Sequence, residues 1–263
     1  MTDTTPLDLA HTAMNAAPED DTARLRFYER LADGEMFMLL AEEAIGDDVR
    51  PDVLNVGEDS YVLVFDRVER LTGFTGAPAP YAALSGRVIA GLLAGQGIGL
   101  GVNLEVAPSS ILIPARAVDW LHATLGQTPQ EIEARPLRFD APKGLPDVVL
   151  GALDTKLATA TGLAQSAYLV AASYEGGGKG HLLAFVGVTP GAQGALAQAA
   201  GEALTFSGIE AGAIDVAFFA ADDPRVAAMS KCGLRYDLPQ PTEADSFTRP
   251  APGSDPAKPP KLR

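Results

Sequence analysis

The chain has 263 residues, of which 47% are apolar and 21% charged, so wholesale disorder is excluded and two domains are expected. Its 34 acidic and 20 basic side chains give a net charge of −14, which argues against nucleic acid and anionic membranes as partners, because both are bound through cations. One cysteine excludes an intramolecular disulfide and a multi-cysteine zinc site, and three histidines leave little material for another metal centre.

Targeting signals are not apparent in the sequence. Residues 1–8 are polar and acidic, unlike the basic and apolar start of a secretory signal peptide. The longest nearly apolar stretch, residues 88–102, is shorter than the ~20 residues that span a bilayer. We therefore expect a cytoplasmic protein.

Charge and proline content divide the chain into four parts. Residues 1–127 are strongly acidic and are predicted to form the first domain, and residues 146–238 the second. The segment 128–145 is rich in proline, which favours extended backbone, so we expect a connector or an edge strand over 131–139. Residues 239–263 contain seven prolines and few large apolar side chains, so this tail is predicted to be disordered.

In the first domain, hydrophobic periodicity predicts helices interspersed with short strands. In chain order these are a helix over 7–17, a helix capped by Asp20 or Asp21, strands over 36–40, 53–56 and 61–65, a short helix begun by Asp66 and Glu69 as a capping box, a helix opened by Ser85, strands over 98–104 and 110–113, and a helix over 114–125.

The second domain has a simpler order of elements. A helix over 145–157 precedes two strands, 168–174 and 181–188, and the glycine-rich turn between them predicts an antiparallel hairpin. A helix around 196–204, a strand over 213–220 and a helix over 223–231 follow. Because strands and helices do not alternate strictly, the predicted class is α+β, with two mixed α/β domains whose sheets are largely antiparallel or mixed.

The strand over 98–104 alternates apolar residues with Gly99, Gly101 and Asn103. The face with the small residues is expected to be bare enough for a backbone or a ligand to approach closely. The glycines do not form a dinucleotide fingerprint, because they follow a helix and enter a strand. Arg87 or Arg116 could pair with a ligand carboxylate, so Arg87, Asn103 and Arg116 are the candidate ligand or interaction residues.

The sequence indicates no catalytic constellation. Cys232 lies at the end of the last predicted helix, where the negative end of the helix dipole disfavours a thiolate. The histidines lack partners at metal-ligand spacing, and the adjacent acidic pairs fit helix caps and loops better than carboxylates held across a cleft. We therefore expect no catalytic residues, no metal and no cofactor.

Short motifs in the first half carry a family resemblance. They are Pro6-Leu7-Asp8-Leu9, Phe27-Tyr28-Glu29-Arg30-Leu31, Phe37-Met38-Leu39-Leu40, Val64-Phe65 followed by Val68-Glu69-Arg70-Leu71, Gly86-Arg87, and Gly101-Val102-Asn103-Leu104 followed by Ile113-Pro114. Together they resemble the SseB family (enhanced serine sensitivity protein B). The second half is similar to the family's C-terminal domain in its order of elements, and it departs from the family by running into a proline-rich tail after Tyr236.

The resemblance implies a two-domain bacterial cytoplasmic protein with no established reaction, and the family's name points towards serine or sulfur metabolism. Our favoured hypothesis is a non-enzymatic protein-binding or regulatory module of the SseB type, whose acidic surface would steer a basic protein partner. The alternative is a sensor of a small molecule such as an amino acid or a nucleotide. A hydrolase or thiol enzyme that uses Cys232 is the third and least favoured hypothesis.

Overall fold

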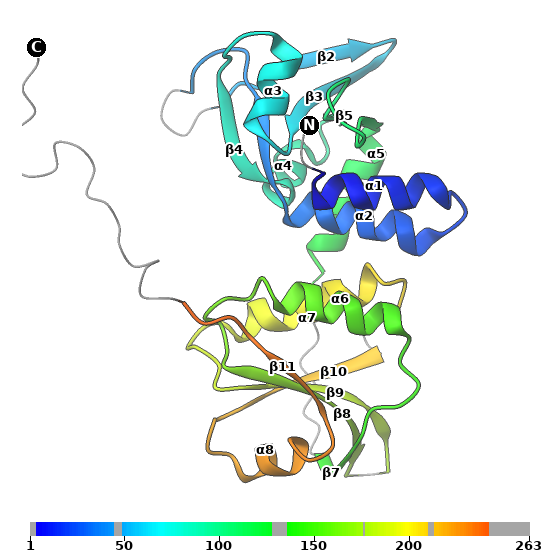
Figure 1. The fold of residues 1–263 in the computed structure, drawn as a ribbon, viewed down its shortest axis with the longest axis vertical. Helices are drawn as coiled ribbons and strands as arrows, with labels where there is room; N and C mark the ends of the chain where they lie inside the picture. Colours follow the sequence, from blue (N-terminus) through cyan, green and yellow to red (C-terminus); the bar gives the residue numbers. More distant parts are fainter. Residues whose placement is uncertain (1–3, 45–48, 128–135, 176, 210–212, 242–263) are drawn as a thin grey trace, which may run out of the picture. The chain divides into compact units, whose positions relative to one another are not determined.

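The structure, a computed structural model, describes residues 4–44, 49–127, 136–175, 177–209 and 213–241. They form two compact units, which we describe separately (Figure 1). The described residues of unit 1 lie within Met1–Glu133, Pro146–Leu153 and Gln198–Ala213, and those of unit 2 lie within Ala134–Leu145, Asp154–Ala197 and Ile214–Arg263. Two helices, α6 (Asp147–Leu157) and α7 (Gln193–Thr205), therefore contribute residues to both units.

The described part of unit 1 contains a six-stranded mixed sheet with the order β4-β1-β3-β5-β6, in which β2 also pairs with β3. The strands are β1 (Glu35–Leu39), β2 (Val53–Val56), β3 (Asp59–Phe65), β4 (Tyr81–Ser85), β5 (Ile98–Val102) and β6 (Ile111–Ile113). Strands β3 and β5 run parallel, and the other pairs are antiparallel. The edge strand β4 has no counterpart among the predicted strands.

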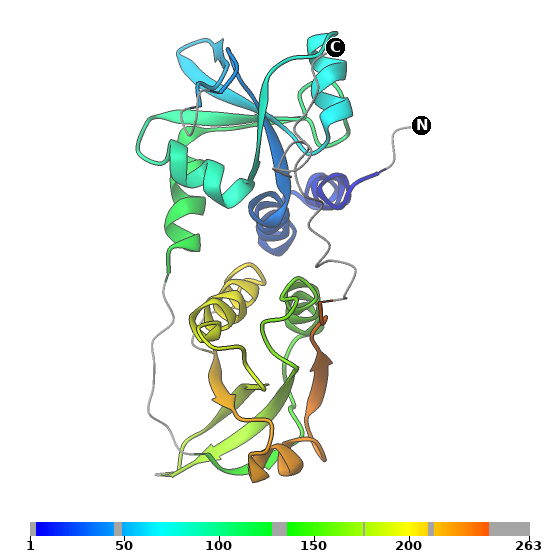
Figure 2. The ribbon, with the colours of Figure 1, turned by 90° about the vertical axis from the view of Figure 1, so that its left-hand side faces the viewer.

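Helices cover both faces of this sheet. They are α1 (Pro6–Ala16), α2 (Asp21–Asp33), α3 (Val68–Thr75), α4 (Gly86–Leu93) and α5 (Ala115–Leu125), and Figures 1 and 2 show α1 and α2 side by side. Successive residues of β3 point to opposite faces, as its strand geometry requires. Val64 therefore joins the core built with α1, α2, α4 and α5, whereas Phe65 joins a smaller core with Leu71 of α3.

Two of the predicted helix starts in unit 1 are confirmed. The side chain of Asp20 accepts a hydrogen bond from the N–H of Thr22 at the start of α2, and that of Ser85 accepts one from the N–H of Val88 at the start of α4. The predicted capping box of Asp66 and Glu69 is wrong. Helix α3 begins one residue later, without a side-chain cap, because the Asp66 carboxylate is bound elsewhere.

The described part of unit 2 contains a five-stranded mixed sheet with the order β10-β9-β8-β11, in which β7 also pairs with β8. Its elements are β7 (Pro136–Asp140), β8 (Ser166–Tyr174), β9 (Lys179–Val186), β10 (Ile214–Phe219), α8 (Pro224–Met229) and β11 (Leu234–Asp237). The predicted antiparallel hairpin of β8 and β9 is confirmed, and β9 pairs in parallel with β10. Two mixed sheets with helices confirm the α+β class. Strand β11 was not predicted.

Some predicted segments lie wholly or partly outside the described residues. This applies to 128–135 of the predicted connector and 242–263 of the predicted tail. The described end of the chain is bound to unit 2, because the N–H of Gly162 donates to the carbonyl oxygen of Pro239 at 2.8 Å. Among the described residues, no helix combines the length and apolar character needed to cross a membrane.

Candidate functional site

The three candidate residues predicted from the sequence lie in different surroundings within unit 1. Arg87, in the first turn of α4, forms ion pairs with Asp33 at 2.8 Å and with Glu202 of α7 at 2.9 Å. The hydrogen bonds that Arg87 donates to Glu202 and Asp33 hold the pKa of Arg87 above its usual value. The charge of Arg87 is thus already matched by two carboxylates, and a ligand carboxylate would have to compete with them.

Asn103 is fully buried directly after β5. Its φ of 46° lies in the left-handed region, which asparagine tolerates better than most residues. The side-chain Oδ1 accepts a hydrogen bond from the N–H of Asp66 at 3.1 Å, and Nδ2 donates to the Oγ of Ser109 at 2.8 Å. The amide of Asn103 therefore joins the end of β3 to the segment between β5 and β6.

Asn103 belongs to a buried polar group, the Arg70 cluster, which we define as Asp8, Asp66, Arg70, Asn103 and Ser109. The guanidinium of Arg70 donates to Asp8 at 2.5 and 3.0 Å and to Asp66 at 2.8 Å. The Ser109 hydroxyl donates to Asp8 at 2.6 Å. These bonds tie α1, α3 and the β5–β6 segment together.

The Asp8 carboxylate stays charged although it is buried. Burial alone would raise its pKa, but hydrogen bonds from Arg70, Ser109 and the N–H of Thr5 hold the pKa of Asp8 well below its usual range. The Nε of Arg70 is the one buried side-chain nitrogen or oxygen of the described residues that has no hydrogen-bond partner. The cluster thus has the character of a structural clamp.

The glycine face of β5 is approached closely, as predicted, but by the backbone and side chains of neighbouring strands, which take the space that a ligand would need. Gly99 pairs with Tyr61 and Gly101 with Leu63 of the neighbouring strand β3. A Cβ at Gly99 would lie 2.4 Å from the carbonyl oxygen of Ile113 and 2.7 Å from the Tyr61 ring. A Cβ at Gly101 would lie 2.8 Å from Leu63. Large side chains of β3 occupy the space that the glycines leave, and the glycines serve close packing.

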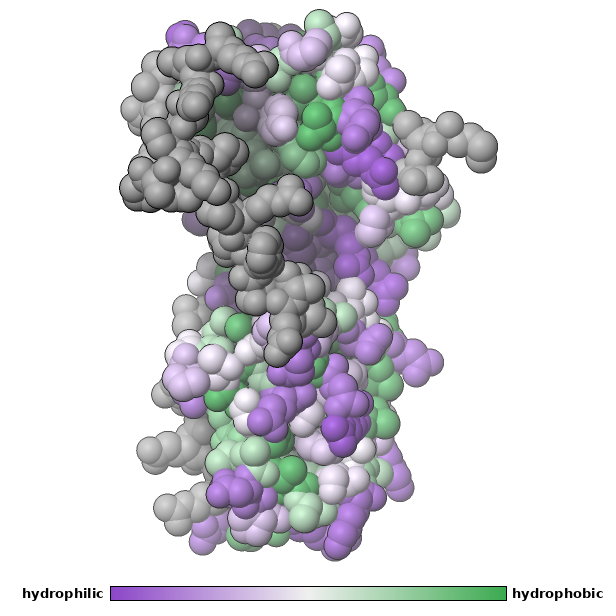
Figure 3. All heavy atoms as spheres, turned by 60° about the vertical axis from the view of Figure 1, so that its left-hand side comes forward, coloured by the Kyte–Doolittle hydropathy of each residue, from purple (hydrophilic) through white to green (hydrophobic). Residues whose placement is uncertain are grey.

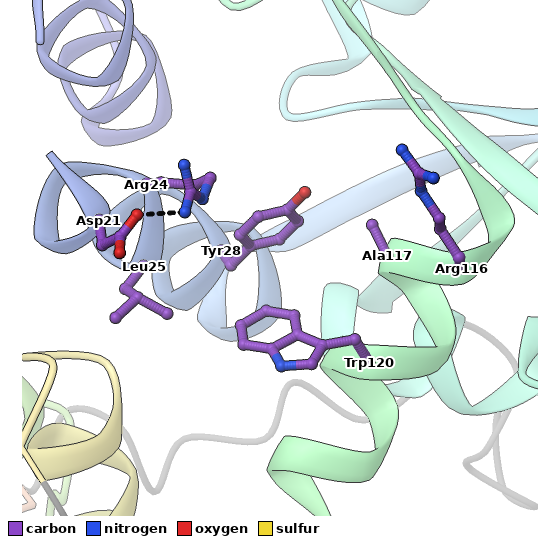
Figure 4. Close-up of a pocket in the computed structure, with 7 residues that line it drawn as sticks. All are labelled: Asp21, Arg24, Leu25, Tyr28, Arg116, Ala117 and Trp120. Carbon is purple, nitrogen blue, oxygen red and sulfur yellow. Dashed lines mark hydrogen bonds and ion pairs between the residues drawn. The ribbon is translucent and has the colours of Figure 1, made fainter. Parts of the chain in front are cut away.

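Arg116, the third candidate, lines a pocket between α2 and α5 (Figure 4). We call this the α2–α5 pocket; it has a volume of about 400 Å³ and is lined by Asp21, Arg24, Leu25 and Tyr28 of α2 and by Arg116, Ala117 and Trp120 of α5. The lining residues of α2 recur every three or four positions and so share one face of the helix. Neither Arg87 nor Asn103 lines this pocket.

An aromatic wall forms one side of the pocket. The rings of Tyr28 and Trp120 meet edge to face, with centroids 5.3 Å apart and planes at 68°. Trp120 also meets Phe206, with centroids 6.4 Å apart. Phe206 is fully buried, whereas Trp120 remains 39% exposed. The indole is therefore packed against neighbouring rings and still accessible to a partner.

The two arginines of the pocket differ in how far their charge is matched. Figure 4 shows them on either side of the Tyr28 ring, with Arg24 paired to Asp21. Arg116 is exposed and forms no hydrogen bond or ion pair with another part of the described chain. A guanidinium in this state can bind a carboxylate through two parallel hydrogen bonds. The pocket therefore combines an aromatic surface with an available cation.

The pocket was not predicted as a unit, although the sequence contains a signal for it. Arg24 and Tyr28 are four residues apart on one helix, and Arg116 and Trp120 are four residues apart on another. This spacing places each arginine and aromatic pair on one helix face. The pairing of the two helix faces follows only from the tertiary structure.

The hypothesis of a thiol enzyme that uses Cys232 gains no support from the described residues. Burial and the nearby charge of Asp140 raise the pKa of the Cys232 thiol, which is opposite to the change that activates a nucleophile. Within the described ranges, no group of three or more histidine, cysteine, aspartate or glutamate side chains is placed to hold a metal ion.

Residues 11–120 match the family model described as SseB protein N-terminal domain. No curated protein and no solved structure matches the chain. The matched range includes every residue that lines the α2–α5 pocket and every member of the Arg70 cluster except Asp8.

Proposed function

Because residues 11–120 match the model of the SseB protein N-terminal domain, we propose that this chain is a non-enzymatic protein-binding or regulatory module of the SseB type. The observation that carries this proposal is the composition of the α2–α5 pocket, where a tryptophan, a tyrosine and two arginines converge. These residue types supply most of the binding energy at protein interfaces, particularly where they line a pocket.

The pocket and the charge of the chain together define the partner's chemistry. An apolar side chain of the partner would pack on Trp120, and a neighbouring carboxylate would bind Arg116. Basic residues beside that anchor would be attracted by the net charge of −14. Figure 3 shows hydrophilic and hydrophobic residues interspersed on the visible surface of each unit.

The test is affinity capture with the wild type, Trp120→Ala and the control Tyr81→Ala. Tyr81 is an exposed aromatic residue of β4 outside the pocket, and it is 44% exposed. A partner that uses the pocket should be retained by the wild type and the control, and its affinity for Trp120→Ala should fall by roughly tenfold or more when titrated as a pure protein. Equal retention by Trp120→Ala would contradict the proposal.

A second candidate function is a small-molecule sensor, and the availability of Arg116 favours it. A volume of about 400 Å³ is suited to a metabolite, and Arg116 would bind its carboxylate. The family's name refers to serine sensitivity, so serine is the first ligand to test, followed by other amino acids and nucleotides. The sensor predicts a rise in the melting temperature at millimolar ligand that is lost in Arg116→Ala. No rise with any of these ligands would count against it.

A further inference from the structure

Unit 2 contains a second hollow that gathers positive charge within a chain of net charge −14. Its charged and titratable lining consists of Arg138, Asp140, Lys143, Lys179 and His181, and the remaining lining residues are alanine or glycine. The volume is about 690 Å³, within the range of pockets that hold small molecules. These basic side chains come from β7, the segment after it and β9.

The strand register explains why basic side chains lie on both sides of small residues of the central strand β8. Arg138 on β7 and Lys179 on β9 both pair with Ser173 of the central strand β8. Ala171, two residues earlier on β8, lies on the same face and pairs with His181. The outer strands lie two strand spacings apart, about 10 Å, so the small Ala171 and Ser173 separate the longer basic side chains.

The charges of the hollow are only partly matched. Arg138 donates to Asp140 at 2.8 Å, which offsets one positive charge. Lys143 and Lys179 are exposed, and neither forms an ion pair with any part of the chain that the structure describes. The Nε2 of His181 lies 3.1 Å from the carbonyl oxygen of Lys143, a contact that holds the segment after β7 beside β9.

We propose that this hollow binds a compact polyanion that carries phosphate groups. Lysine and arginine are the residues that bind phosphate oxygens. The basic side chains lie on two strands that are about 10 Å apart, and this arrangement suits a ligand with two or more phosphates. The lining contains no phenylalanine, tyrosine or tryptophan for a nucleobase to stack on. The hollow therefore recognises the anionic part of the ligand, and the acidic chain disfavours long nucleic acids.

The test is calorimetric titration of the full chain with inorganic pyrophosphate at low ionic strength, where charge attraction is least screened. Lys179→Ala and Lys143→Ala should each weaken pyrophosphate binding by about tenfold, because each removes a charged hydrogen-bond donor. Lys231→Ala removes the same charge from an exposed lysine outside the hollow and should change the affinity by less than about twofold.

Two further arms decide the chemistry and the place of binding. Citrate carries several carboxylates, so tighter binding of pyrophosphate than of citrate supports recognition of phosphate, and equal binding overturns it. Arg116→Ala, in the α2–α5 pocket, should leave pyrophosphate binding unchanged. The proposal is overturned if pyrophosphate does not bind at millimolar concentration, or if Lys231→Ala weakens binding as much as Lys179→Ala.

Discussion

Arg70 and Arg116 belong to the same unit, yet their surroundings are opposite. The Arg70 side chain is 2% exposed and lies between the carboxylates of Asp8 and Asp66, whereas Arg116 is exposed and forms no ion pair with a described residue. Arg70 stands within one of the motifs that carried the family resemblance, and Arg116 does not. The comparison indicates that the motif arginine maintains the fold, while the arginine outside it is available to a partner.

The largest expected effect is a loss of stability when the buried arginine, Arg70, is replaced. Arg70→Met leaves Asp8 and Asp66 without their cation, so the free energy of unfolding should fall by about 3–5 kcal/mol. Urea denaturation measures this loss. The control Arg50→Met removes an exposed ion pair with Glu42 and should cost less than about 1 kcal/mol. Equal losses in the two variants would show that the Arg70 cluster is not a clamp.

The next effect tests whether the glycine face is closed. Gly99→Ala places a Cβ against Ile113 and Tyr61 and should lower the free energy of unfolding by about 2–3 kcal/mol. Gly201→Ala is the matched control, because Gly201 lies inside α7 with open space around the Cβ position. A gain of up to about 1 kcal/mol is expected there from helix propensity. If Gly99→Ala left the free energy of unfolding unchanged, the glycine face of β5 would be open after all.

Acid should weaken the Arg70 cluster. The pKa of Asp8 is lower in the folded than in the unfolded chain, so its stabilising contribution is present above the unfolded value of about 3.9 and is lost as pH falls below it. Between pH 5 and pH 2 the wild type should lose about 2 kcal/mol more than Asp8→Asn. Denaturation curves at several pH values measure the difference, and parallel pH dependences would contradict it.

The smallest expected effect is on the stability of Arg116→Ala. Since Arg116 has no ion pair among the described residues, the free energy of unfolding should stay within about 0.5 kcal/mol of the wild type. Thermal and urea unfolding measure this difference. A loss above about 1 kcal/mol would give Arg116 a structural role and weaken its assignment to a binding pocket.

Local patterns were sufficient to predict much of the fold. The alternation of glycine and apolar residues in β5, the serine cap of α4 and the glycine-rich turn between β8 and β9 each depend on neighbouring residues. The edge strands β4 and β11 were missed because they are short and each pairs with one strand distant in sequence. Their extended state depends on that pairing more than on their own residue pattern.

The site was less predictable, because burial and long-range contacts decide it. Asp66 has a capping position by its local pattern, but the buried guanidinium of Arg70 and the hydroxyl of Thr5 take up its carboxylate. Gly101 looks open in the sequence, and Leu63 of another strand covers it. Arg116 was selected for its charge alone, and its aromatic neighbours became apparent only when α2 and α5 were brought together.

The aromatic wall of the pocket has a consequence for the thermodynamics of association. Tyr28 meets the fully buried Phe27 at 5.6 Å, and Trp120 meets the buried Phe206. Contact with a buried ring restricts the rotamers open to the half-buried Tyr28 and to Trp120 before a partner arrives. Such preorganised side chains lose little conformational entropy on binding. A partner that docks on Trp120 would therefore lose less of its binding energy to the ordering of these side chains.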